Sequence, residues 1–401
     1  MKKKYIITLL TAIVMILLMQ IGYDALVGDD SRDKIKVGFL YVGDSCNMYT
    51  QNFIHAQEQM ELAMGDRVET IAKYNVAEGM EKQYIQELVD EDCDLIMGTS
   101  YGYQDQMKTF AQRYPQIQFC MATGDNADEA PVLSNYHTVM GAVYQGRYIA
   151  GVVAGMKMQE MIDQGIISPE QAKIGYVGAF PYAEVISGYT AFFLGARSVV
   201  PTATMSVRYT NSWGDYGLER QMTKKFIKEG CVIISQHSDT AGPAIACEES
   251  IESHTVYHVG YNWSMTDVAP TTSLIGCRIN WAPYLISAVD AVFHHETIES
   301  HVDAACFGTD ASAGFDKNWV QMLKLNDIIA AEHTQETIDE LIKGFSKNEI
   351  EVFQGDYIGV DPFDETDVYD LSDGYAENES QSSPSFHYVL QDVITVINEE
   401  E

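Results

Sequence analysis

Short apolar runs alternate with amphipathic stretches along most of the chain. Runs rich in β-branched and aromatic residues cover 35–42, 94–97 and 117–122, and each ends in glycine or small polar residues. Apolar positions with helical spacing lie between these runs: Tyr84, Ile85, Leu88 and Val89, then Met107, Phe110, Ala111 and Tyr114. Since the two periods alternate, we expect a parallel sheet with crossover helices.

The same alternation starts again near residue 173. The segment KIGYVG at 173–178 resembles the opening of the first unit at 36–43. Further strands are predicted at 209–212, 232–235, 256–261 and 273–279. A helical face precedes Gly230: Leu218, Met222, Phe226 and Ile227. The pattern therefore predicts two similar α/β units in tandem, with ligand contacts at the strand ends.

The two ends of the chain depart from this pattern. Lys2, Lys3 and Lys4 precede an uncharged run, 5–23, that is long enough to cross a bilayer as a helix. We interpret 1–23 as an export segment, and the lack of a convincing cleavage site favours an uncleaved anchor over a cleaved signal. Residues 24–33 then form a tether, and the body lies outside the cell membrane.

These observations give a domain plan. The first lobe is predicted at 34–125 plus 263–300 and the second at 126–262 plus 301–360. The remainder, 361–401, is an acidic extension that docks on the lobes through the apolar-rich stretch 388–397, with an exposed loop at 378–385.

The composition and net charge of the chain limit the classes of partner that it can bind. A chain of 401 residues with 46% hydrophobic and 21% charged residues is globular and large enough for two domains. The net charge of −33 argues against nucleic-acid binding, which requires clustered Lys and Arg. The simplest interpretation of the acidity is solubility.

Neither the cysteines nor the histidines of the sequence indicate a metal or cofactor site. Seven cysteines form no C-x-x-C pair, and three of them, Cys120, Cys231 and Cys277, lie within or beside apolar runs and are expected to be buried. The adjacent residues 294–296, His-His-Glu, would point apart on a helix. We therefore expect no metal and no cofactor.

Several motifs in a fixed order point to a known family. They are MATG at 121–124, QGRYIAGVVAG at 145–155, KIGYVGAFP at 173–181, FLGARSV at 193–199, YTNSWGD at 209–215, SQHSD at 235–239, VGYN at 259–262 and INWAPY at 279–284. Across roughly 35–397 the chain resembles the basic membrane protein family of ABC-transporter substrate-binding proteins, which includes purine nucleoside receptors. The resemblance implies an α/β type I periplasmic-binding fold, in which two Rossmann-like lobes with parallel sheets are joined by a three-strand hinge.

The same resemblance implies the function. A monomeric protein of this kind closes on a small purine-type molecule, delivers it to an ABC permease and performs no chemistry. The usual lipoprotein cysteine is missing, and the first-lobe motif at 44–50 diverges. Asn262 stands where ribose-binding members tend to carry Asp, and their Lys near Asn280 and Trp281 is absent. These departures favour a free base such as adenine over a nucleoside.

A purine needs aromatic faces and polar edge contacts. Trp213 is the first candidate for stacking, with Tyr49 and Tyr101 as partners across the cleft. Asp239 either accepts from the base or caps a helix. Side-chain amides are offered by Gln236, Asn262 and Asn280. The remaining predicted contacts are Asp44, Thr50, Ser100, Thr123, Asn211 and Trp281.

Some of these residues also fit a structural role in place of a ligand contact. Asp44 either reaches the ligand or caps the first helix, and Ser100 and Thr123 also suit their own turns. Glu184 better fits a cap at a helix start than a ligand contact. His237 fits a ligand contact and a structural hydrogen bond equally well.

Two other functions stay open. A membrane-tethered sensor would use the same pair of lobes, although no signalling domain follows them. A nucleoside-cleaving enzyme would need a cluster of carboxylates, whereas those of this chain lie on separate strand ends.

Overall fold

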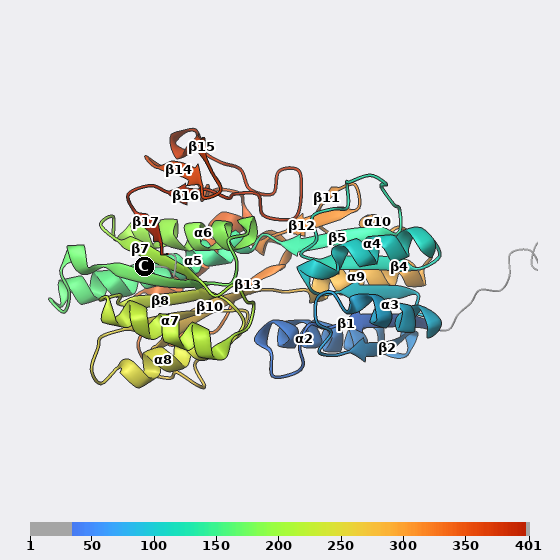
Figure 1. Ribbon diagram of the computed structural model, residues 1–401, viewed down its shortest axis with the longest axis horizontal. Helices are drawn as coiled ribbons and strands as arrows, with labels where there is room; N and C mark the ends of the chain where they lie inside the picture. The colour runs from blue at the N-terminus through green and yellow to red at the C-terminus, as the bar shows by residue number, and fades with distance from the viewer. Residues whose placement is uncertain (1–33, 398–401) are drawn as a thin grey trace, which may run out of the picture.

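The computed structural model describes residues 34–397 (Figure 1). The predicted anchor at 1–23 and the tether at 24–33 lie outside the described residues. Within 34–397, none of the helices has the length and apolar character that crossing a membrane requires.

The first of two large sheets has the strand order β11-β12-β5-β4-β3-β1-β2. All its pairings are parallel except that of β11 with β12. Its strands are β1 (Ile35–Leu40), β2 (Val68–Lys73), β3 (Leu95–Gly98), β4 (Gln118–Ala122), β5 (Tyr136–Gly141), β11 (Ala305–Phe307) and β12 (Asp310–Ala313). The helices packed with it are α2 (Met48–Met64), α3 (Glu81–Asp90), α4 (Gln104–Arg113), α9 (Ala282–Phe293) and α10 (Ile298–His301). We call this unit the first lobe.

The second sheet has the order β13-β10-β9-β8-β6-β7-β17, and only β13 runs antiparallel to its neighbour. Its strands are β6 (Lys173–Gly178), β7 (Thr204–Tyr209), β8 (Ile233–His237), β9 (Tyr257–Tyr261), β10 (Ser273–Ile279), β13 (Val320–Met322) and β17 (Ile394–Val396). The helices of this second lobe are α5 (Val143–Asp163), α6 (Ala183–Val199), α7 (Tyr216–Lys228), α8 (Gly242–Ser250) and α11 (Thr334–Ser346). The predicted fold of two parallel-sheet lobes is confirmed.

The chain passes between the lobes three times, after β5, β10 and β12. The predicted lobe boundaries at 125, 262 and 300 differ from these points. In each case the last strand before the crossing still belongs to the lobe that the chain is leaving. Strands β5 and β12 pair in parallel with each other, Asp310 opposite Thr138, and so complete the first sheet. Pairing between strands that are distant in sequence decides where the crossings lie, and local periodicity does not report it.

Helices α5 and α6 pack against each other with almost no space between their backbones. A Cβ atom added at Gly151 would lie 1.8 Å from the carbonyl oxygen of Phe192, and one at Gly195 would lie 2.1 Å from that of Tyr148. The close packing of the two helices therefore requires glycine at 151 and at 195. The predicted burial of Cys120, Cys231 and Cys277 is also confirmed.

Residues 354–397, which we call the C-terminal extension, contact both lobes. A small antiparallel sheet, β15-β14-β16, forms the outer part of the extension and lies over α6 (Figure 1). Its strands are β14 (Ile358–Asp361), β15 (Asp364–Asp370) and β16 (Val389–Leu390). Strand β17 then joins the second sheet beside β7, while the backbone N–H of Ser382 donates to Asp310 Oδ2 of the first lobe at 2.6 Å. The prediction of an exposed loop at 378–385 is wrong for Ser382 and Ser383, which are both buried.

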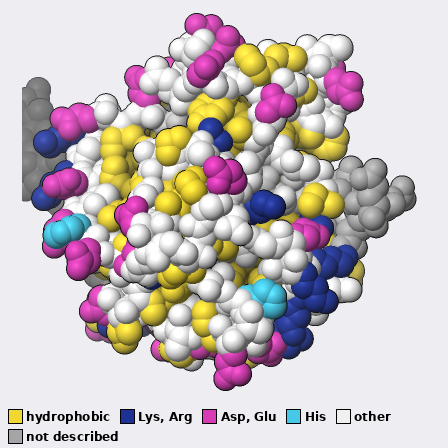
Figure 2. All heavy atoms as spheres, turned by 90° about the vertical axis from the view of Figure 1, so that its left-hand side faces the viewer, with side chains coloured by type: hydrophobic (Ala, Val, Ile, Leu, Met, Phe, Trp, Pro, Cys, Tyr) yellow, Lys and Arg dark blue, Asp and Glu magenta, His cyan; other side chains and the backbone are white. Residues whose placement is uncertain are grey.

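Acidic side chains are spread over the surface rather than gathered in one patch on the face in Figure 2. Lys and Arg side chains collect at one edge of the same face. The spread of the acidic groups fits a solvated surface.

Candidate ligand-binding site

A cavity lies between the lobes at the carboxyl ends of the parallel strands. Its space is about 410 Å³, including the opening to solvent. The first lobe contributes loops after β1, β3 and β4 together with α2, and the second lobe contributes the ends of β6, β7, β8 and β9. The lining residues are Val42, Tyr49, Ser100, Tyr101, Thr123, Glu184, Trp213, His237, Asp239, Tyr261 and Asn262.

Two tyrosines form the first-lobe wall, and both are held by hydrogen bonds. The Tyr49 hydroxyl donates to the carbonyl of Thr99 at 2.6 Å, and the Tyr101 hydroxyl donates to Asp125 Oδ2 at 2.9 Å. Burial, followed by the hydrogen bond to Asp125, raises the pKa of Tyr101 to about 12. Both rings are therefore neutral, fixed surfaces at physiological pH.

An aromatic cluster forms the facing wall. Trp213 packs edge-on against Phe180 at 5.3 Å between ring centroids, and Phe180 stacks on Tyr182 at 5.1 Å. Tyr182 also meets Tyr101 of the first lobe at 5.9 Å, so the cluster spans the gap between the lobes. Strand β7 ends at Tyr209, before the predicted strand position at 209–212, and Trp213 therefore lies in the following loop.

The carboxyl group of Asp239 is buried in the second-lobe part of the cavity. Burial, reinforced by the negative charges of Glu219 and Glu184, raises the pKa of Asp239 well above its usual value. Its backbone N–H donates to the carbonyl of Trp213 at 2.7 Å, which fixes the acid and the indole relative to each other. The residue thus offers a hydrogen-bonding edge beside an aromatic face.

Two more polar side chains in this wall have buried nitrogen atoms that make no hydrogen bond to the described residues. Both ring nitrogens of His237 and the Nδ2 of Asn262 are buried without a hydrogen bond. His237 Nε2 lies 3.4 Å from Glu184 Oε1, and burial lowers the pKa of His237 below its ordinary value. Since a buried polar group without a partner is costly, these atoms indicate a polar ligand in the cavity.

A buried arginine supports this wall from behind. The Arg147 guanidinium lies over Tyr261 at 5.3 Å from the ring centroid and also donates to Ser235 Oγ at 3.0 Å and to the hydroxyl of Tyr176. The side chain is fully buried. Arg147 therefore holds the ends of β8 and β9 together through hydrogen bonds and cation–π contacts.

Seven of the predicted ligand contacts line the cavity, and the other six do not. Gln236 is engaged elsewhere: its Nε2 donates to the carbonyls of Ser238 and Thr240, and its Oε1 accepts from His258. These bonds hold the loop that carries Asp239. Burial lowers the pKa of His258 to about 3, so its imidazole is neutral and able to serve this network.

Asn280 and Trp281 belong to the hinge and the core. The Asn280 amide donates to the carbonyl of Asn318 at 2.9 Å. This bond links the segment of the second crossing, after β10, to that of the third, after β12. Trp281 is buried and stacks on Phe53 at 4.6 Å. Both follow β10 at the point where the chain leaves the second lobe, where the Asn280 amide is used by its bond to Asn318 and the Trp281 ring by packing in the first-lobe core.

The other three residues serve local turns. Thr50 is buried, and its hydroxyl accepts from the backbone N–H of Gly43 at 3.1 Å. Asp44 accepts from the N–H of Cys46 at 2.9 Å, and Asn47 rather than Asp44 caps α2. Asn211 is exposed and takes a left-handed backbone conformation, with φ of 52°.

Sequence reasoning overlooked Val42 and Tyr261 and gave Glu184 a capping role. Tyr261 immediately precedes Asn262 at the end of β9, so the strand-end rule could have found it. Glu184 lies in the first turn of α6 but faces the cavity beside His237. The proximity of these two side chains has no signal in the local sequence.

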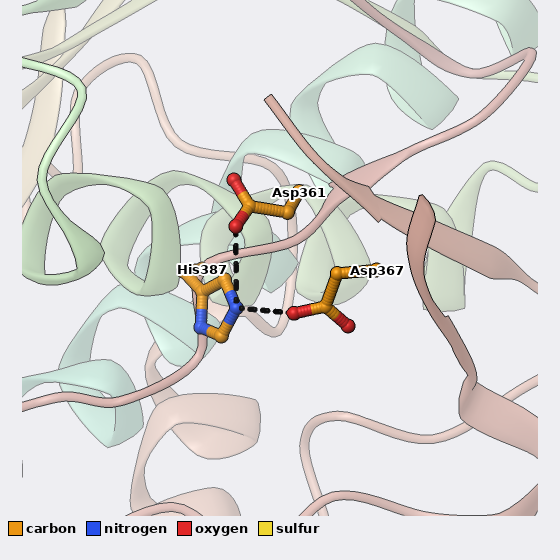
Figure 3. A group of neighbouring side chains, drawn as sticks. All are labelled: Asp361, Asp367 and His387. Atoms are coloured by element: carbon orange, nitrogen blue, oxygen red, sulfur yellow. Dashed lines mark hydrogen bonds and ion pairs between the residues drawn. The ribbon is translucent and has the colours of Figure 1, made fainter. Parts of the chain in front are cut away.

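Metal-ligating side chains gather elsewhere, at the C-terminal extension. Asp361, Asp367 and His387 bring carboxylate and imidazole atoms within 4.8 Å of one another (Figure 3). Asp361 and His387 line a second pocket rather than the ligand cavity. The imidazole Nε2 lies 3.4 Å from Asp367 Oδ2 and 3.8 Å from Asp361 Oδ2.

The chain matches the family model of PnrA-like ABC transporter substrate-binding proteins over residues 50–353. It is 35% identical to a purine-binding protein of Brucella abortus (strain 2308), over 65% of this chain and 70% of that protein. It is 29% identical to a putative ABC transporter glucose-binding protein, TsgA13, of Haloferax volcanii, over 78% of this chain and 75% of that protein.

Solved structures share the fold at low sequence identity. A solute-binding protein of an ABC transporter system from Aeropyrum pernix K1 superposes with a TM-score of 0.64 at 12% identity. The match covers 79% of this chain and 92% of that protein. This similarity supports the two-lobed architecture alone.

Proposed function

The chain belongs to the PnrA-like family of ABC transporter substrate-binding proteins, and on this basis we propose that it captures a purine between its lobes for delivery to an ABC permease. An adenine-like free base is the favoured ligand. The N-terminal segment would anchor the monomeric protein outside the membrane.

One observation carries the proposal. Trp213 lines the cavity from the second lobe, and Tyr49 and Tyr101 line it from the first. Asp239 and the nitrogens of His237 and Asn262 that make no hydrogen bond belong to the same lining. A purine offers two flat faces for stacking and ring nitrogens or amino groups that pair with these polar atoms. The relative named as purine-binding supports this choice.

A glucose-like ligand is the competing candidate, because one relative is named a putative glucose-binding protein. Aromatic walls also suit the apolar faces of sugars. The side chains of His237 and Asn262 pair equally well with a sugar hydroxyl and with a ring nitrogen.

A thermal-shift screen separates these ligands. Adenine, guanine, adenosine and glucose are added to the purified chain at increasing concentration. A bound ligand at about 100 times its Kd stabilises the folded state by about 2.7 kcal/mol, which raises the melting temperature. We expect adenine to give the largest shift. A shift with glucose and none with any purine would refute the proposal.

An uptake assay in cells distinguishes a role in transport from a role in sensing. Loss of the protein should abolish uptake of labelled purine if it serves a permease, whereas a sensor would leave uptake intact. Release of free base on incubation with labelled nucleoside would instead indicate an enzyme.

A further inference from the structure

An imidazole and two carboxylates converge on the small sheet of the C-terminal extension. Strand β14 pairs with β15 on one side and with β16 on the other, and this brings Asp361, Asp367 and His387 together. Each side chain supplies one nitrogen or oxygen atom, and the three atoms lie within 4.8 Å of one another (Figure 3). Strand pairing, rather than a motif in the sequence, creates this group, which we call the extension cluster.

A hydrogen bond fixes which ring nitrogen of His387 faces the carboxylates. Nδ1 lies 2.8 Å from the backbone carbonyl oxygen of Ser385. A carbonyl only accepts, so Nδ1 carries a proton, and a neutral ring presents the lone pair of Nε2 to the two acids. In histidines that ligate a metal, the nitrogen that does not ligate donates to a carbonyl or a carboxylate in this way.

The two carboxylates are oriented in the same manner, each through the oxygen that does not face His387. Asp361 Oδ1 accepts from the backbone N–H of Phe363 at 2.8 Å, and Asp367 Oδ1 accepts from the hydroxyl of Tyr388 at 3.2 Å. The Oδ2 atom of each acid is the one near Nε2. Three donor atoms therefore point toward one place, and a different group outside the cluster holds each of the three side chains.

The separations within the extension cluster fit a shared ion better than a hydrogen bond. Nε2 of His387 lies 3.4 Å from Asp367 Oδ2 and 3.8 Å from Asp361 Oδ2. A charge-assisted hydrogen bond from nitrogen to oxygen is about 2.7–2.9 Å long. Two ligand atoms that each lie about 2.0–2.1 Å from a tetrahedral zinc ion are about 3.4 Å apart. Both oxygens therefore leave room for an ion between themselves and the imidazole.

The charge of the extension cluster also favours a divalent cation. The two carboxylates carry two negative charges, and one added proton on the imidazole offsets only one of them. Among residues 34–397, the ion pairs of Asp361 and Asp367 are with His387 alone. A second group of acids and histidines differs, because Asp290, which lies 3.3 Å from His301, also pairs with Arg67 at 3.3 Å. That group includes a permanent cation, whereas the extension cluster does not.

We propose that the extension cluster binds one divalent transition-metal ion of the zinc type. Imidazole combined with carboxylates is a donor set that zinc accepts, whereas calcium and magnesium prefer oxygen atoms alone. The side chains of Asp367 and His387 are 44% and 36% exposed, so the ion reaches them from solvent and water completes its coordination.

The ion would join the three strands of the small sheet. Asp361 ends β14, Asp367 lies in β15, and His387 just precedes β16. None of the three residues lines the ligand cavity, and all lie beyond residues 50–353, which the family model matches. The site is therefore independent of the proposed binding of purines.

Calorimetric titration of the full chain with zinc chloride tests the site, after the chain has been dialysed against EDTA and then against buffer without chelator. We expect one saturable site per chain. The melting temperature should rise with zinc concentration, because an ion that binds only the folded chain stabilises it. Calcium and magnesium should bind more weakly than zinc. The absence of a saturable zinc site would overturn the proposal, and so would tighter binding of calcium or magnesium.

Two single substitutions assign the ion to the extension cluster. His387→Ala removes the nitrogen ligand, and Asp367→Asn removes a charge while keeping the oxygen that accepts from Tyr388. We expect the Kd for zinc to rise at least about 100-fold in each, since the loss of an outer hydrogen bond alone costs about 10–100-fold. Both side chains are partly exposed, and circular dichroism verifies that the variants fold. Unchanged zinc binding in either folded variant would overturn the proposal.

A third substitution tests the orientation of the ligands. Tyr388→Phe removes only the hydroxyl that donates to Asp367, so the Kd for zinc should rise about tenfold or more. The matched control is His254→Ala, at an exposed histidine of the second lobe that contacts Ser253, and it should leave the Kd as it is. An equal loss of affinity in the control would show that zinc binds surface histidines without selection, which would also overturn the proposal.

Discussion

The position of the Trp213 indole at the cavity is fixed by the loop that carries it and by the ring beside it. Its backbone carbonyl accepts from the N–H of Asp239, and its ring rests on Phe180, so the indole is held at the cavity before any ligand arrives. A wall that is already in place loses little conformational entropy on binding. The indole is therefore expected to contribute strongly to affinity.

Trp213→Ala should weaken purine binding by about 2 kcal/mol or more, which is about 30-fold in Kd, because a stacking face is lost. Calorimetric titration with adenine gives the value. Trp263→Ala is the matched control, since Trp263 is exposed and outside the cavity lining. Comparable losses in both variants would remove Trp213 from the site.

The raised pKa of the Glu219 carboxyl group makes the free energy of unfolding depend on pH. Burial raises the pKa of Glu219 to about 7 from the usual 4.5, although hydrogen bonds from Thr240 and Ser238 oppose the shift. Folding therefore favours the protonated acid. The contribution is fully present below pH 4.5 and is lost as the pH rises through about 7, a change of about 3 kcal/mol.

Glu219→Gln should remove this dependence. We expect the free energy of unfolding of the native chain, relative to that of the variant, to fall between pH 4.5 and 7.5, and urea denaturation measures it. His258 and His237 titrate in the opposite sense, but they are common to both proteins and cancel in the difference. Glu332→Gln, at an exposed acid, provides the control. A difference that does not vary with pH would contradict the prediction.

At the scale of elements, periodicity located most strands and helices. The predicted run 273–279 coincides with β10, and the spaced apolar positions after residue 215 lie on α7. Strand β7 was predicted too late because Tyr209 is its last residue and the polar loop after it continues the motif. Local alternation marks an apolar run well, but hydrogen bonds with neighbouring strands determine where the strand ends.

The interface of α5 with α6 gives an element-scale prediction. Gly151→Ala would place a methyl group 1.8 Å from the carbonyl oxygen of Phe192, so the helices must separate. We expect a loss of about 3 kcal/mol or more in the free energy of unfolding. Gly217→Ala adds the same methyl group in α7, where its nearest contact is 3.5 Å away, and should be neutral or stabilising. Equal effects on urea midpoints would refute the steric argument.

The whole molecule depends on a C-terminal extension that contacts both lobes. Strand β17 completes the second sheet, Ser382 bonds to Asp310 of the first lobe, and Phe386 and Leu390 are buried. The sequence suggested docking of its apolar end but not the bond to β12. A contact between residues 72 positions apart has no local signature.

Ending the chain after Phe353 should therefore lower stability by several kcal/mol, because an edge strand is lost and apolar core surface is exposed. Chemical denaturation of the truncated chain measures the change. A chain that ends after residue 397 is the control and should unfold at the native midpoint. An unchanged midpoint in the shorter chain would show that the extension is not part of the folding unit.

The sequence by itself determined the tandem α/β pattern, the strand ends that line the cavity between the lobes, and the family. These follow from local periodicity and from motifs in a fixed order. Only the tertiary structure decided which strand joins which sheet and that Gln236 holds a loop while its neighbour His237 reaches the cavity. It also placed Arg147 behind Tyr261. Such choices depend on competition among hydrogen-bond partners that are distant in sequence, and that competition is resolved only when the lobes are packed.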